Sequence, residues 1–72
     1  MQLFTYNFTD LTSFDSPYKE VWIDEEDLSD FAKRAAREVL EAVPDLRNKG
    51  LCIGIYDEAG KPISYLPLDT LQ

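Results

Sequence analysis

The chain has 72 residues, of which 44% are hydrophobic, and its formal net charge is −7. This length allows one domain, residues 1–72, and the hydrophobic fraction is that of a folded protein and not of a disordered one. The acidity opposes binding to nucleic-acid backbones, and no apolar run approaches the roughly 20 residues that span a bilayer. We therefore expect no direct nucleic-acid binding and no membrane insertion. We also see no signal peptide at the N-terminus.

The first half of the chain predicts two strands separated by a polar loop. Residues 3–8 alternate, with Phe4, Tyr6 and Phe8 on one face, as in a half-buried strand. Residues 10–19 contain Asp, Ser, Thr and Pro17 and predict a loop. Residues 20–23 predict a short strand, on which Trp22 faces away from its two aliphatic neighbours.

A helix over residues 28–43 is predicted next. Apolar residues recur there at spacings of three and four and form one stripe, made of Leu28, Phe31, Ala32, Ala35, Val39, Ala42 and Val43. Asp24 or Asp27 is the expected N-cap, and Pro44 is expected to end the helix.

Residues 51–56 and 61–66 predict a second pair of strands. Leu51, Ile53 and Ile55 are expected to point inward, and Cys52 and Tyr56 outward. The loop between the strands ends in Gly60, which is expected at a positive φ. Residues 67–72 predict a tail. The elements together predict an α+β fold, a two-layer ββαββ domain in which one helix packs on one face of an antiparallel sheet.

A resemblance is carried by three segments of this chain. They are the opening strand that ends in Asp10, the acidic lead-in to an Ala- and Arg-rich helix over residues 24–40, and the turn at residues 56–62. In these the chain resembles a family of short bacterial domains of unknown function that is common in rhizobia. The resemblance implies a bacterial source and carries no activity with it. The single cysteine, Cys52, cannot form an internal disulfide, and we therefore expect a location in the reducing cytoplasm of the cell. In size and acidity the chain is also similar to small phage inhibitors of bacterial defence complexes, including anti-CRISPR proteins.

Catalysis and metal binding find little support in the composition. The chain has no histidine and one cysteine, Cys52, which argues against a zinc site and removes the commonest general base. The acidic segment 24–30 lacks the ligand pattern of a calcium loop. We therefore expect no catalytic residue, no metal and no cofactor. A small hydrolase that uses paired carboxylates is kept as a third alternative.

The excess charge is confined to one stretch of the chain. Residues 10–30 hold eight acidic residues and one basic residue, whereas residues 31–72 hold six of each. A local cluster of negative charge can attract a basic surface of a partner protein. The same stretch contains Tyr18 and Trp22, and Tyr and Trp are frequent at binding interfaces. Alternatively, the acids serve only the helix N-terminus and solubility.

The resulting expectation is a non-enzymatic interaction module, with a phage or mobile-element inhibitor that docks on a basic, nucleic-acid-binding protein as the leading case. The alternative is a bacterial domain that acts by binding a cellular protein or by homodimerising through its open sheet face. The expected partner-binding residues are Asp15, Tyr18, Glu20, Trp22, Asp24, Glu25, Glu26, Asp27 and Asp30.

Overall fold

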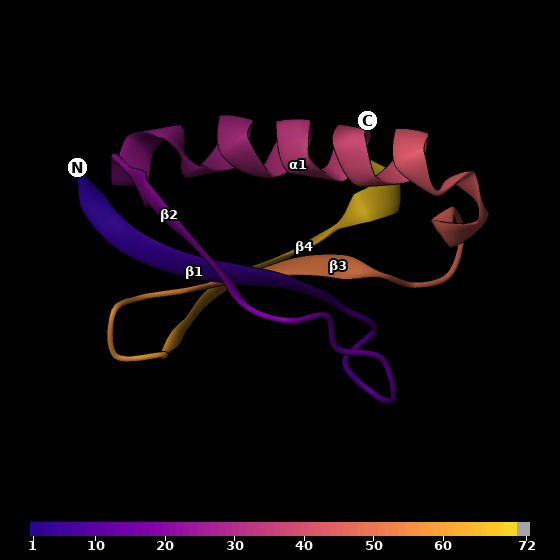
Figure 1. Ribbon diagram of the computed structural model, residues 1–72, viewed down its shortest axis with the longest axis horizontal. Helices are drawn as coiled ribbons and strands as arrows, with labels where there is room; N and C mark the ends of the chain where they lie inside the picture. The colour runs from indigo at the N-terminus through magenta and orange to yellow at the C-terminus, as the bar shows by residue number, and fades with distance from the viewer. Residues whose placement is uncertain (71–72) are drawn as a thin grey trace.

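A computed structural model describes residues 1–70, which form one antiparallel sheet with one helix across it (Figure 1). The sheet has the strand order β2-β1-β3-β4, and the expected α+β architecture is confirmed. Its elements are β1 (Gln2–Thr9), β2 (Lys19–Ile23), α1 (Leu28–Ala42), β3 (Cys52–Tyr56) and β4 (Pro62–Pro67). Three short 3₁₀ turns occupy Glu25–Asp27, Pro44–Leu46 and Leu68–Thr70. No helix in the described part of the chain has the length and apolarity needed to cross a bilayer.

The two hairpins of the chain, β1–β2 and β3–β4, meet at the centre of the sheet, where β1 pairs with β3. The helix connects β2 to β3 across one face, so both hairpins lie in the same sheet with β1 and β3 inside and β2 and β4 at the edges. In Figure 1 the loop at residues 10–18 and the turn between β3 and β4 both project away from α1. In that turn Gly60 has a φ of +82°, as expected from the sequence.

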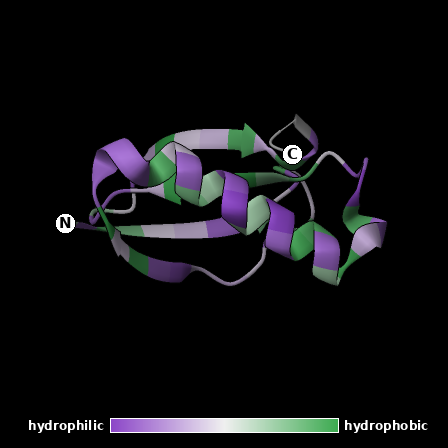
Figure 2. Cartoon of the chain, turned by 90° about the horizontal axis from the view of Figure 1, so that it is seen from above, coloured by the Kyte–Doolittle hydropathy of each residue, from purple (hydrophilic) through white to green (hydrophobic). Residues whose placement is uncertain are grey.

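The hydrophobic core lies between the sheet and α1. The central strands supply Phe4, Ile53 and Ile55, all almost fully buried. The edge strands add partly buried side chains that pack against this core, among them Val21 and Leu66. Figure 2 looks onto the helix and shows its hydrophilic residues on the outer side, so one stripe of α1 faces the sheet.

The buried stripe of α1 differs from the expected one. Its fully buried members are spaced by four and are Leu28, Ala32, Ala36 and Leu40. Three residues of the expected stripe are only half-buried at its margin, namely Phe31, Ala35 and Val39, and Ala42 and Val43 are exposed. The predicted stripe was wrong in omitting Ala36 and Leu40, which the spacing of four from Leu28 and Ala32 places on the same face of the helix.

The N-terminus of α1 is not capped by a side chain. Asp24 and Asp27 stand at the capping positions, but neither carboxylate bonds to the backbone of the first turn. Instead the carbonyl of Asp24 accepts a hydrogen bond from the Asp27 amide, which forms a 3₁₀ turn, and the amino group of Met1 lies 3.1 Å from Asp24 Oδ1. The expected N-cap position is therefore confirmed at Asp27 for α1 and at Asp24 for the 3₁₀ turn before it, but no side-chain cap bond forms at either residue.

The segment after β4 is part of the core. Leu68, expected in a tail, is 1% exposed, and its amide donates to the carbonyl of Leu51. The carboxylate of Asp69 accepts a hydrogen bond from the amide of Asn48. The chain therefore closes its core with residues from both ends, and the rest of the expected tail, residues 71–72, lies outside the described residues.

Candidate functional site

The sheet face opposite α1, here called the open face, has no second layer over it within the described residues (Figure 1). Strand register places on this face Leu3, Thr5, Asn7 and Thr9 of β1, Glu20 and Trp22 of β2, Cys52, Gly54 and Tyr56 of β3, and Tyr65 and Pro67 of β4. The centre of the open face is packed, whereas its margins are exposed.

An aromatic row crosses the open face. The ring of Tyr56 makes edge-to-face contacts with Tyr18 and Tyr65, at centroid distances of 5.4 Å and 6.0 Å. Its hydroxyl lies over Gly54 and donates a hydrogen bond of 2.9 Å to Asn7 Oδ1. Burial raises the pKa of Tyr56, so the hydroxyl stays a donor well into the alkaline range.

Two residues expected to be exposed on this face are buried. Tyr56 and Cys52 are 7% and 6% exposed. Tyr56 is covered by its aromatic neighbours. Cys52 lies near the loop at residues 10–18, which folds against the end of β1 through a bridge between Thr9 and Asp15. The thiol of Cys52 donates to the carbonyl of Thr9, and burial raises its pKa, which favours the unreactive thiol.

The loop at residues 10–18 is held by one carboxylate. Asp10 Oδ1 accepts hydrogen bonds of 2.9 Å from the amides of Phe14, Thr12 and Ser13. These amide donors, that of Phe14 first, hold the pKa of Asp10 well below its usual range. Asp10 therefore orders the loop from which Tyr18 reaches Tyr56.

The margins of the open face expose large apolar side chains. Trp22 and Tyr18 are 63% and 65% exposed on the β2 side, and Tyr65 is 41% exposed on the β4 side. Glu20 is exposed between Tyr18 and Trp22. Exposed aromatic residues gathered on one face of a small protein commonly mark an interface.

The structure divides the nine expected partner-binding residues among several places. Tyr18, Glu20 and Trp22 share the open face, as just described. The carboxylate of Asp15 accepts a hydrogen bond from the hydroxyl of Thr9 and so belongs to the loop structure. The other acids lie around the start of α1, and Asp30 is on the helix, in a groove shared with three bases, Lys33, Arg34 and Arg37. Ile63 and Glu58 were not among the expected residues, and both line a cleft beside the helix start.

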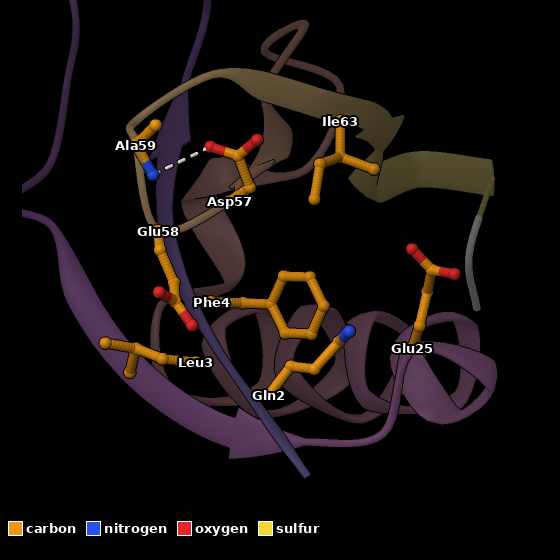
Figure 3. A pocket seen from close by; sticks show the side chains of 8 residues that line it. All are labelled: Gln2, Leu3, Phe4, Glu25, Asp57, Glu58, Ala59 and Ile63. Carbon is orange, nitrogen blue, oxygen red and sulfur yellow. Dashed lines mark hydrogen bonds between the residues drawn. The ribbon is translucent and has the colours of Figure 1, made fainter.

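A cleft with a volume of about 430 Å³ connects the open face with the helix start (Figure 3). Its apolar lining includes Leu3, Phe4 and Ile63, and Glu25 and Glu58 approach it from opposite sides. Asp57 also lines the cleft, but its carboxylate accepts hydrogen bonds from the amides of the β3–β4 turn, including Ala59. An apolar base with free carboxylates at its rim matches the shape of a long basic side chain, which has an apolar stem and a charged head.

The carboxylates of Asp24, Glu26 and Asp27 lie within 4.8 Å of one another at the helix start. All three are exposed, and exposed acids approach one another in this way in many proteins without binding an ion. They therefore add to the acidic field at this end of the molecule.

The basic residues lie mostly away from the open face. Six of the seven bases lie away from the open face. Lys33, Arg34 and Arg37 are on α1, Arg47 and Lys49 are in the connection that follows it, and Lys19 points to the helix side of the sheet. The acidic excess is therefore strongest at the helix start, and the strands contribute Glu20 to the open face.

Comparisons with protein-family models, with curated proteins and with solved structures found no match to this chain.

Proposed function

We propose that this protein is a non-enzymatic binding module that docks on a basic surface of another protein through its open face. The observation that carries the proposal is the exposure of Trp22 and Tyr18 on either side of Glu20. Arginine and lysine side chains bind well to such a surface, because the rings attract cations through their faces and the carboxylate pairs with the charge.

The acids near the start of α1 support the same partner chemistry. Glu25, Glu26 and Asp27 form no hydrogen bond or ion pair from their side chains to other described residues. Free carboxylates of this kind steer a basic partner during encounter without being needed for the fold. An inhibitor of a nucleic-acid-binding complex, the class expected from the sequence, would use this surface in place of the phosphates that its target binds.

The test is capture of proteins from a bacterial lysate by the wild-type chain, with identification by mass spectrometry and measurement of the association with each captured protein. We expect a basic partner whose association slows as salt rises. Neutralising Glu25→Gln, Glu26→Gln and Asp27→Asn together should slow association, and Trp22→Ala should speed dissociation.

The control is Glu41→Gln, which removes one charge from the exposed side of α1 far from the open face. It should bind as the wild type does. A partner that binds the wild type, the triple variant and Trp22→Ala equally well, with no dependence on salt, would refute the proposal. A stable dimer that buries Trp22 in sedimentation equilibrium would favour the homodimer alternative instead.

A further inference from the structure

The two edges of the sheet differ in a way that bears on how a partner is recognised. The outer edge of β4 has prolines at both ends, Pro62 and Pro67, and proline lacks the N–H that an added strand would need. The outer edge of β2 has no proline, and its five residues form a regular ladder with β1 from Lys19 to Ile23. The prolines therefore disfavour addition of a strand at the β4 edge, whereas the β2 edge is free to pair with one.

The backbone of β2 has unused hydrogen-bonding capacity. In an antiparallel strand, every second residue points its N–H and C=O away from the neighbour with which it pairs. Within residues 1–70, β2 pairs with β1 alone, and no backbone or side-chain hydrogen bond from elsewhere reaches Lys19–Ile23. In Figure 2 neither the helix nor a loop lies over the outer edge of β2. Among residues 1–70, no protein group therefore pairs with these outward groups.

The charge around the two edges also differs. β2 contains Glu20 and is followed directly by four acids at residues 24–27, with Lys19 as the single base, whereas β4 contains no charged residue and is flanked by Lys61 and Asp69. A second copy of this chain would bring two such acidic segments, each from a chain of net charge −7, close to one another. The occupant that complements the β2 edge is therefore an extended segment rich in arginine or lysine.

We propose that β2 accepts an extended basic segment of the partner as a fifth strand of the sheet. This inference rests on the proposed function and specifies its geometry. Backbone pairing along Lys19–Ile23 sets the register, and alternate side chains of the added strand then face Trp22 and Glu20 on the open face. This protein then recognises the segment by backbone hydrogen bonds along β2 and by the positive charge of the segment's side chains.

The experiment uses the full chain and synthetic nine-residue peptides in which arginine and valine alternate. A matched control peptide carries an N-methyl group on every internal residue, which keeps the side chains and charge but removes the backbone donors. We expect the parent peptide to bind and the methylated peptide to bind at least about tenfold more weakly, because several hydrogen bonds are lost together. Hydrogen exchange followed by NMR should show new protection at amides of Lys19–Ile23, and none in β4.

Protein variants separate the charge from the backbone contribution. Glu20→Gln should weaken binding of the parent peptide, and Glu41→Gln should leave it unchanged. Equal binding of the parent and methylated peptides would overturn strand addition while leaving the proposed docking on a basic surface intact. Failure of both peptides to bind would contradict both proposals, and new protection in β4 in place of β2 would overturn the assignment of the edge.

Discussion

The hydroxyl of Tyr56 donates a hydrogen bond to Oδ1 of Asn7, and this bond joins β3 to β1 across 49 positions of the chain. Asn7 is 1% exposed on a sheet face that has no covering layer. Burial of a side-chain amide costs free energy unless the amide is hydrogen-bonded. The Tyr56 ring lies along β3 in a position from which its hydroxyl reaches the Asn7 amide oxygen. Gly54 makes this possible because it has no side chain beneath the phenol ring.

Gly54→Ala tests this arrangement. A Cβ at Gly54 would lie 2.5 Å from the Tyr56 hydroxyl and 3.0 Å from Cε1 of Tyr65. The variant should lose about 1–3 kcal/mol of unfolding free energy, because the ring must leave its position. Denaturant unfolding measures the loss. Unchanged stability, together with unchanged NMR shifts of the Tyr56 ring, would show that the ring does not lie over Gly54.

Tyr56→Phe isolates the hydrogen bond. The substitution keeps the ring contacts but leaves Asn7 Oδ1 buried without its donor, and it should cost about 1–2 kcal/mol of unfolding free energy. Tyr6→Phe is the matched control, because the Tyr6 ring contacts Phe8 and Phe31 edge-to-face and its hydroxyl forms no hydrogen bond with another residue of the described range 1–70. Equal effects of the two substitutions in denaturant unfolding would argue against the Tyr56–Asn7 bond.

Leu40→Ala should be among the most damaging substitutions in α1. Leu40 is 0% exposed and packs in the core between helix and sheet, so truncation should cost about 2–5 kcal/mol through lost burial and a cavity. Val43→Ala, at an exposed position, should cost less than about 1 kcal/mol. Thermal or denaturant unfolding compares the two. A larger loss of unfolding free energy for Val43→Ala than for Leu40→Ala would support the buried stripe predicted from the sequence instead.

The acid sensitivity of the loop at residues 10–18 should follow Asp10. Because its pKa is lowered in the folded chain, its contribution to stability is present above the ordinary carboxyl value of about 3.9 and is lost as pH falls through the lower folded value. NMR titration should therefore show the amide shifts of Thr12 and Phe14 unchanged at pH 4 and moving only in stronger acid. Asp10→Ala should give loosened loop amides at every pH. Titration of Asp10 near its ordinary value would contradict the hydrogen-bonded geometry.

Gly60→Val should destabilise the β3–β4 turn. Gly60 has a φ of +82° and open space around its Cα, so the cost arises from backbone conformation and not from a clash. We expect a loss of about 1 kcal/mol or more. Gly60→Asn, a residue that tolerates this region better, should lose less. The two variants are compared by denaturant unfolding, and a similar loss for both would point to a cause other than φ.

The sequence predicted the elements and their faces because these depend on local periodicity. Alternation at residues 3–8 and 51–56 correctly assigned Phe4, Ile53 and Ile55 to the helix side, and Gly60 correctly marked the turn. The charge confinement was also visible, because it requires only a count along the chain. Each of these features is decided by neighbours within a few residues.

Only the tertiary structure decided which side chains are buried by segments distant in the sequence. Tyr56 and Leu68 are buried by residues far from them in sequence, so local patterns placed both on the outside. The candidate site depends on the same long-range pairing. Strand register joins Tyr18 and Trp22 to residues of β4 on one face, whereas most of the neighbouring acids lie at the helix start. A sequence pattern shows which side of a strand a residue occupies, but only the fold determines whether another segment lies over that side.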